Sequence, residues 1–201
     1  NNDELVATYG NLVHRVLTFA YRRFNGQVPQ PSRLGPRDDE ILDTVANAFV
    51  PVGRHLGECH FRAALNAAMG AAQAVNRYLD TTAPWKTFKR NPDAAATSIY
   101  VALRAIDSLK MLFYPFLPFS SQALHEMLGY KGDIAGRQYL QDIAEGDAIH
   151  RVLRYDSDKN VGAWAPSHLP VGQKLRRPKP LFAKLDEAII EQELARLGGE
   201  A

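Results

Sequence analysis

The sequence predicts an all-α protein: a helical bundle of about five main helices, followed by an extended C-terminal segment and a final amphipathic helix. Three observations support this fold class. Apolar residues recur at spacings of three and four through most of the first 128 positions, the pattern of helices that bury one face. Prolines and acidic residues stand where these segments begin. Prolines and glycines separate the segments, because a helix seldom continues through them.

The first helix is predicted from about Leu5 to Phe24, and it should end at Asn25-Gly26. One stripe of this helix is apolar and should face the core. On the opposite side lie Asn11 and Arg15, which are four residues apart and therefore neighbours on the helix surface. A rigid element thus presents an amide and a guanidinium side by side, and the alternative interpretation of this pair is an ordinary solvated helix face.

The same signals predict the linker and the remaining helices of the bundle. Residues 27–36 contain three prolines and a glycine and are predicted to be a linker. Further helices are expected over residues 36–52 with a kink at Pro51, over 60–80, from 91 to about 113, and over 120–128. The alanines of the 60–80 helix indicate close helix packing, and the helix that starts near residue 91 should be the most buried.

The last third of the chain is less regular. Residues 130–160 are polar and weakly periodic, and a single short helix is expected there, around residues 137–144. Residues 161–180 contain two glycines and four prolines, so they should cross a surface in extended form. Apolar residues from Phe182 to Leu197 then predict the final amphipathic helix. We therefore divide the chain into a bundle over residues 1–160 and a tail over residues 161–201.

Composition is typical of a globular protein, with 46% hydrophobic and 23% charged residues. The net charge is +2, and residues 1–90 hold 11 basic and 8 acidic residues against 13 and 14 in the remainder. This small positive excess is weak evidence for a nucleic-acid partner. No apolar run is long enough to span a membrane and no signal peptide is visible, so a cytoplasmic location is expected, with no membrane partner.

No catalytic constellation appears in the sequence. It has no glycine-rich phosphate loop, no nucleophile elbow and no His-Glu-x-x-His metal motif. Cys59 is the single cysteine, and together with six scattered histidines it gives no spacing typical of zinc sites, with Cys59-His60 the nearest approach. We therefore expect no catalytic residue, no metal ion and no cofactor in this chain.

Trp85 is the second candidate binding residue. It follows Pro84 in the turn that ends the 60–80 helix, and a planar ring near amide and guanidinium donors suits a nucleobase. Its alternative role is a lid on the hydrophobic core. The neighbouring cations Lys86, Lys89 and Arg90 could then contact phosphates of the same ligand, or simply form a solvated turn.

Several short motifs together resemble methionyl-tRNA synthetase, a class I aminoacyl-tRNA synthetase. They are Asn2-Asp3-Glu4-Leu5, then Gly10-Asn11-Leu12-x-x-Arg15, then Asn76-Arg77-Tyr78 with Ala83-Pro84-Trp85, and finally residues 166–181 with the late Lys-Pro-Leu-Phe. The resemblance covers nearly the whole chain. It corresponds to the family's C-terminal anticodon-binding domain, which is an α-helical bundle.

The resemblance implies that Asn11, Arg15 and Trp85 read the CAU anticodon of methionine tRNA, initiator and elongator alike, with the tryptophan stacked on the wobble cytosine. It also implies that the parent enzyme attaches methionine using ATP and magnesium. The His-x-Gly-His and Lys-Met-Ser-Lys-Ser signatures of the catalytic domain are missing. We therefore expect an inactive, monomeric fragment whose tail from Val161 packs back toward the catalytic domain of the same polypeptide.

Two alternatives stay open at this point. The chain could be the equivalent domain of another class I synthetase, for cysteine, valine or isoleucine. It could also be a helical scaffold that binds proteins through the face of its first helix and its basic tail, without binding RNA.

Overall fold

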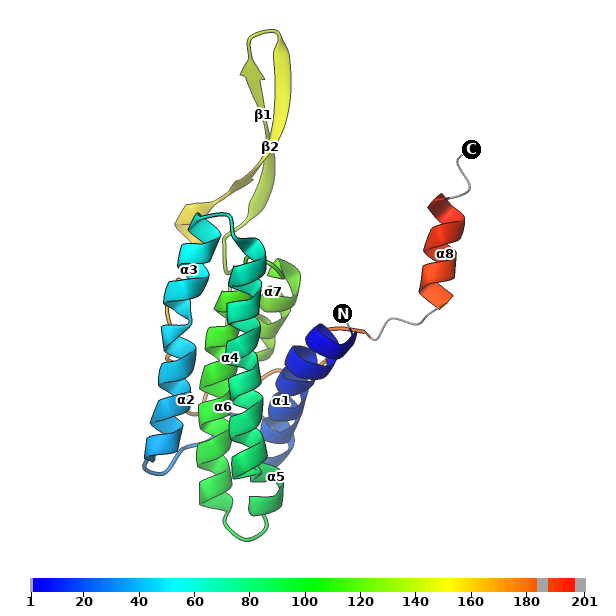
Figure 1. Cartoon of the computed structure of the whole chain (residues 1–201). Helices are drawn as coiled ribbons and strands as arrows, with labels where there is room; N and C mark the ends of the chain where they lie inside the picture. The colour runs from blue at the N-terminus through cyan, green and yellow to red at the C-terminus, as the bar shows by residue number, and fades with distance from the viewer. Residues whose placement is uncertain (1, 184–187, 198–201) are drawn as a thin grey trace.

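The computed structural model describes residues 2–183 and 188–197 and shows a bundle of helices with a β-hairpin projecting from one end (Figure 1). The elements in chain order are the π-helical η1 (Asn2–Gly10), α1 (Asn11–Arg23), α2 (Pro36–Asn47), α3 (Phe49–Gly57), α4 (Phe61–Thr82), α5 (Pro84–Thr87), α6 (Pro92–Phe113), α7 (Pro118–Met127), β1 (Gln138–Glu145), β2 (Ala148–Tyr155), the 3-10 helix η2 (Ser157–Lys159) and α8 (Ala188–Leu197). None of the helices within the described ranges is both long and apolar enough to cross a membrane.

Helix α6 is the centre of the bundle, and it is buried along most of its length, as predicted. It packs against α1, α2, α4, α5 and α7. Pro92 occupies its first turn, and the Asn91 side chain accepts a hydrogen bond from the Ala94 N–H at 3.0 Å. This cap satisfies one of the N–H groups that a helix start leaves without a partner. These five helices are therefore positioned by the central one, and α3 packs on α4 and α2.

Helix α4 confirms the close packing expected from its alanines. Ala64, Ala68, Ala71 and Ala72 are all buried, and these short side chains let α4 approach α6 closely. Near its C-terminal end, the Asn76 amide donates hydrogen bonds to the Thr8 carbonyl at 3.1 Å and to a carbonyl of its own helix at 3.4 Å. The Asn76 side chain therefore fixes the start of the chain against α4.

The predicted second helix is divided into two helices at Ala48, which itself keeps a right-handed helical conformation with φ −66° and ψ −22°. Helix α2 ends at Asn47, and α3 begins at Phe49. Pro51 has no N–H to donate to the Asn47 carbonyl, and its ring crowds that carbonyl. The break therefore lies about one turn before the proline.

The structure is mostly helical, as predicted, but residues 138–155 form an antiparallel hairpin, so the fold is not purely all-α and the short helix expected near residues 137–144 is wrong. Strands β1 and β2 pair from Gln138 opposite Tyr155 to Glu145 opposite Ala148. The two-residue turn holds Gly146 at a left-handed φ of +60°, the signal that sequence reasoning overlooked. Both faces of the hairpin are largely exposed, so its alternation of polar and apolar residues is weak.

The tail crosses the bundle in extended form, as predicted. The Val28 N–H donates to the Gln173 carbonyl at 3.0 Å, and the Leu175 N–H donates to the Gly26 carbonyl at 2.8 Å. Phe182 lies against Tyr9, with ring centroids 6.2 Å apart. Its backbone forms a bend and not a helix, so it does not belong to the final helix. Helix α8 confirms a helix at 188–197, whereas Leu185 of the predicted stripe lies outside the described residues. The boundary at residue 160 and a contact with a catalytic domain stay predictions.

A buried polar network joins the tail to the core. Asp107 of α6 accepts hydrogen bonds from Lys110, from the Tyr130 hydroxyl at 2.7 Å, and from the Ser167 hydroxyl. The Lys110 ammonium also lies 3.2 Å from Nδ1 of His125, whose ring stacks on Tyr130 with centroids 4.8 Å apart. One buried carboxylate thus connects α6, α7, the segment after α7 and the tail.

Replacing His125 tests the electrostatics of this network. Burial, and then the Lys110 ammonium, lower the pKa of His125 below its ordinary value. The folded state therefore binds fewer protons than the unfolded chain, and stability should fall as the pH drops from the unfolded pKa of about 6.5 toward the lower folded value. Urea unfolding between about pH 7.5 and pH 5.5 should show a steeper loss for the wild-type chain than for His125→Gln. Parallel curves for the two proteins would contradict this assignment.

Replacing Gly129 tests how tightly the tail crosses the end of α7. Gly129 has a left-handed φ of +90°, and an added Cβ would lie 1.9 Å from the Lys174 carbonyl oxygen. Gly129→Ala should therefore lower the free energy of unfolding by about 2 kcal/mol or more. The matched control is Gly70→Ala, because nothing lies within 4 Å of its added Cβ and alanine raises helix stability there by up to about 1 kcal/mol. Denaturant unfolding should give the two variants opposite signs, and equal effects would refute the prediction.

Candidate nucleic-acid interface

Helix α1 forms one wall of the candidate site. Its buried side, made of Leu12, Val13, Val16, Leu17 and Ala20, faces the core. On its other side Asn11 is exposed and Arg15 is partly exposed. The apolar stripe therefore fixes the rotation of the helix and determines which polar side chains reach the solvent.

The short helix α5 forms the opposite wall and carries Trp85. Ala83 adopts a left-handed conformation with φ +40°, which turns the chain sharply after α4. Pro84 begins α5, and the Thr87 hydroxyl donates to the Thr82 carbonyl at 3.1 Å across the turn. A non-glycine residue in this conformation costs of order 1–3 kcal/mol and persists only where the surroundings enforce it. The Trp85 ring is therefore aimed by a tightly constrained turn.

Three phenylalanines hold α5 against the end of α1. Phe19, Phe24 and Phe88 meet edge to face, with ring centroids 5.6 Å to 6.2 Å apart. Such arrangements match the positive edge of one ring to the negative face of another. This aromatic cluster couples the position of Trp85 to that of Arg15.

Arg15 and Trp85 meet directly. The Arg15 guanidinium carbon lies 4.2 Å from the centroid of the Trp85 ring, within the range of a cation–π contact. One guanidinium nitrogen also lies 4.0 Å from the Asp80 carboxylate, which is 72% exposed. Because that pair is open to water, it contributes little energy and mainly orients the arginine.

The contact between Arg15 and Trp85 borders an open hollow of about 720 Å³. Trp85 and Phe19 provide aromatic surface, whereas Arg22 and Arg23 add two cations beyond Arg15. The full lining is His14, Arg15, Thr18, Phe19, Arg22, Arg23, Asp80 and Trp85. With three arginines against one carboxylate, the hollow favours a ligand that is anionic and planar.

Asn11 does not line this hollow. It lines a neighbouring one of about 330 Å³ whose other side includes Leu181 and Phe182 of the tail. His14 borders both hollows. The structure therefore brings Arg15 and Trp85 together and places Asn11 one helical turn away, on the same face of α1.

The predicted phosphate contacts Lys86, Lys89 and Arg90 are exposed and lie outside the lining of the main hollow. Sequence reasoning missed Arg23 and Arg177 as cations beside the candidate site. Arg177 and Arg22 line a further hollow of about 340 Å³ next to His14. Spacing could have predicted Arg22, seven residues after Arg15, but only the fold brings Arg177 of the tail to α1.

Two side chains of the motif Asn76-Arg77-Tyr78 have a structural role. Asn76 fixes the chain start, as described above, and the Tyr78 hydroxyl donates to the Asp38 carboxylate at 2.6 Å. Burial and then this hydrogen bond raise the pKa of Tyr78, so the hydroxyl keeps its proton. These two side chains hold α4 between η1 and α2, and α4 in turn ends at the turn that presents Trp85.

The fold recurs in solved synthetase structures. Mycobacterium tuberculosis methionyl-tRNA synthetase bound by methionyl-adenylate superposes with a TM-score of 0.73 and 21% identity, over 90% of this chain and 32% of that one. Its apo form gives a TM-score of 0.73 at 20% identity. At this level of identity the similarity establishes a shared fold.

The sequence is similar to one family of protein domains over most of its length. Residues 28–152 match the family described as the anticodon binding domain of methionyl tRNA ligase. The chain is also 54% identical over 198 residues to the methionine–tRNA ligase of Chloroflexus aggregans and 47% identical over 199 residues to that of Thermomicrobium roseum. It therefore belongs to the family of methionyl-tRNA ligase anticodon-binding domains. These alignments cover 98% of this chain and 33% or 34% of the relatives, so the chain spans about a third of their length.

Proposed function

We propose that this domain reads the CAU anticodon of methionine tRNA through Trp85, Arg15 and Asn11, so that the ligase carrying it charges the correct tRNA. The observation that supports this most is the Arg15 guanidinium stacked on Trp85 beside a basic hollow. Specific RNA recognition uses unstacked bases, which stack on aromatic rings or guanidinium planes and form hydrogen bonds through their edges. Family membership supports the RNA partner, and the geometry supports the residues.

The chemistry of arginine explains a preference for cytosine at the wobble position. A guanidinium only donates hydrogen bonds. The pairing edge of cytosine offers N3 and O2 as acceptors, whereas uracil presents an N3–H donor in place of the N3 acceptor. A base stacked at Trp85 would therefore meet a matching partner in Arg15 if it is cytosine, and an unpaired donor if it is uracil. Leaving a desolvated donor unpaired is costly, so the arrangement discriminates between the two bases.

Asn11 is assigned to a second anticodon base. It lies four residues from Arg15, which is about 6 Å along the helix axis, and its amide both donates and accepts. That combination suits a base edge with mixed donors and acceptors. The adjoining hollow, bordered by Phe182, provides an apolar surface beside it.

The cations around the hollow are assigned to the RNA backbone. Arg22, Arg23 and Arg177 lie on the α1 side, and exposed Lys86, Lys89 and Arg90 follow Trp85. Phosphate contacts of this kind add affinity without reading sequence and make binding dependent on salt. They position the loop so that its bases reach the ring and the guanidinium.

The parent protein is proposed to be a methionine–tRNA ligase that acts on initiator and elongator tRNA. The related Mycobacterium structure carries methionyl-adenylate, the product of joining methionine to the AMP part of ATP. Use of ATP, with magnesium, is therefore assigned to the parent enzyme and not to this domain.

Replacing Trp85 tests the stacking role. Trp85→Ala should weaken binding of a CAU anticodon stem-loop by about 1–3 kcal/mol, the usual value of a base–aromatic stack. Trp85→Phe should retain part of that affinity, because a smaller ring still stacks. Fluorescence anisotropy with a labelled stem-loop measures both variants, and unchanged affinity for Trp85→Ala would falsify the assignment.

Replacing Arg15 tests base discrimination. Arg15→Gln introduces an acceptor beside the donor. The difference in binding free energy between CAU and UAU stem-loops should therefore be smaller than in the wild type by about 1–3 kcal/mol, the value of losing one matched contact. The matched control is Lys86→Gln, which should weaken both stem-loops equally and reduce the salt dependence of binding. A preserved CAU preference in Arg15→Gln, or an equal loss of preference in Lys86→Gln, would remove Arg15 from the reading site.

A further inference from the structure

The turn between α3 and α4 closes with a Schellman motif. The His60 N–H donates to the His55 carbonyl at 2.8 Å, and the Cys59 N–H donates to the Leu56 carbonyl at 3.1 Å. Cys59 has a left-handed φ of +59°, at the position where glycine usually ends a helix. Glu58 is the C-cap between them. Two backbone hydrogen bonds therefore fix the relative positions of His55, Glu58 and His60.

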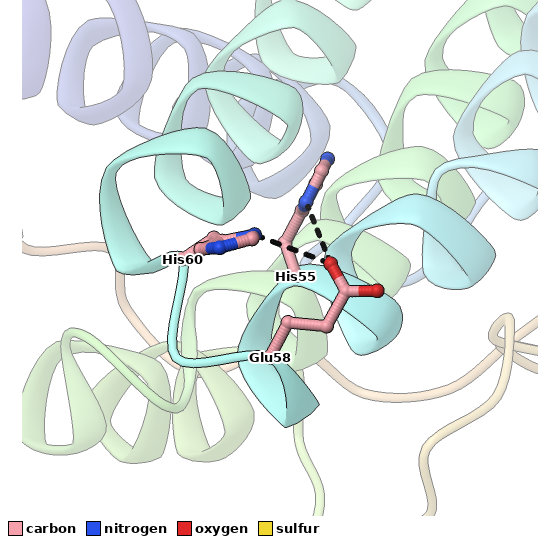
Figure 2. Close-up of side chains that lie close together, drawn as sticks. All are labelled: His55, Glu58 and His60. Carbon is pink, nitrogen blue, oxygen red and sulfur yellow. Dashed lines mark ion pairs between the residues drawn. The ribbon is translucent and has the colours of Figure 1, made fainter.

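This motif normally brings two apolar side chains together, at the positions that His55 and His60 occupy here. In this chain both positions carry imidazoles, with ring centroids 6.1 Å apart. Figure 2 shows the two rings directed at the Glu58 carboxylate, one from the last turn of α3 and one from the start of α4. The same carboxylate oxygen lies 3.2 Å from Nδ1 of His60 and 3.9 Å from Nδ1 of His55.

The protein leaves one of these nitrogens without a partner. Nδ1 of His55 is buried and makes no hydrogen bond with the residues that the structure describes, because 3.9 Å to Glu58 is too long. The side chains of His60 and Glu58 are 63% and 48% exposed. A buried acceptor or donor with no partner is rare in proteins, and here it faces an accessible carboxylate and a second imidazole.

We propose that His55, Glu58 and His60 bind a divalent transition-metal ion of the zinc class. One nitrogen or oxygen of each residue lies within 4.8 Å of the other two. Four-coordinate zinc has bonds of about 2.0–2.2 Å to nitrogen and oxygen, so its ligand atoms are about 3.4 Å apart. The observed separations of 3.2 Å and 3.9 Å bracket that value, and small side-chain rotations close the remaining gap.

The donor set determines which ions suit the site. Imidazole nitrogen favours zinc, copper, nickel and cobalt, whereas magnesium and calcium prefer oxygen ligands throughout. Three protein ligands leave one position for water. Cys59 lies between the ligands in the sequence but is not part of the group of converging atoms. No metal was expected from the sequence because Cys59 and the six scattered histidines show no spacing typical of zinc sites. The convergence of His55, Glu58 and His60 comes from the helix-ending turn.

The bound ion would join the end of α3 to the start of α4. Helix α4 runs about 33 Å from this turn to the one that presents Trp85, and the two turns lie at opposite ends of the bundle (Figure 1). The metal site is thus separate from the proposed RNA-binding hollow. Its role is to stabilise the helix pair without contacting the ligand of that hollow.

Zinc titration of the untagged 201-residue chain tests the proposal. Isothermal titration calorimetry should show one zinc ion bound per chain, and thermal unfolding should show a higher melting temperature with zinc than with EDTA. His60→Ala and Glu58→Gln should each weaken zinc binding at least tenfold. Cobalt, used as a coloured substitute, should give visible absorption of a nitrogen- and oxygen-ligated ion that His60→Ala abolishes.

The matched control is His150→Ala on the hairpin. His150 also lies beside a carboxylate, 3.5 Å from Glu145, but among the residues that the structure describes it belongs to no group of three converging ligand atoms. Its removal should leave zinc affinity and the melting shift unchanged. The proposal is overturned if wild-type protein does not bind zinc, if His60→Ala binds it as tightly as wild type, or if His150→Ala causes the same loss. Binding of one ion between two chains would also overturn it, because the ligands would then come from two copies.

Discussion

The carboxylate of Asp107 is the constraint on which the bundle depends. It is only 2% exposed, and a buried charge is tolerated only when it is paired and hydrogen-bonded. Its partners Lys110, Tyr130 and Ser167 come from α6, from the segment after α7, and from the tail. All three segments must therefore be in place together before the charge is satisfied. Apolar packing supplies most of the stability, whereas this network requires that the tail follow one path over the bundle.

The proposed recognition surface depends on that path and on the central helix. Both α1 and α5 pack on α6, and the Phe19, Phe24 and Phe88 cluster sets their spacing. The tail then adds Arg177 beside α1. Side chains of α1 and of residues 80–85 thus line the main hollow, and Arg177 of the tail lines a neighbouring hollow on the same helix. Because its side chains are already packed against one another, the protein side of the proposed RNA complex would lose little conformational entropy on binding.

Much of the fold could be predicted because helices of this bundle bury one face each, and burial leaves a clear period in the sequence. The outward direction of Asn11 and Arg15 followed from the apolar stripe of α1. The hairpin could not be recognised in the same way, because neither face of residues 138–155 is buried and burial therefore imposes no strong alternation. The contacts between segments could not be predicted from the sequence either. The contact of Arg15 with Trp85, the separate hollow at Asn11 and the approach of Arg177 depend on packing angles that spacing does not encode.

The hairpin has a consequence for the behaviour of the chain in solution. A ribbon of two strands leaves unpaired backbone donors and acceptors along both outer edges, and Leu140, Ile149 and Leu153 are 51% to 74% exposed on one of its faces. Such edges can recruit strands from other molecules. The ion pair between Asp142 and Arg151, set in the middle of that apolar face, opposes stacking of two ribbons, because burying it would remove both charges from water. The exposed charge pair therefore opposes aggregation of the protein at high concentration.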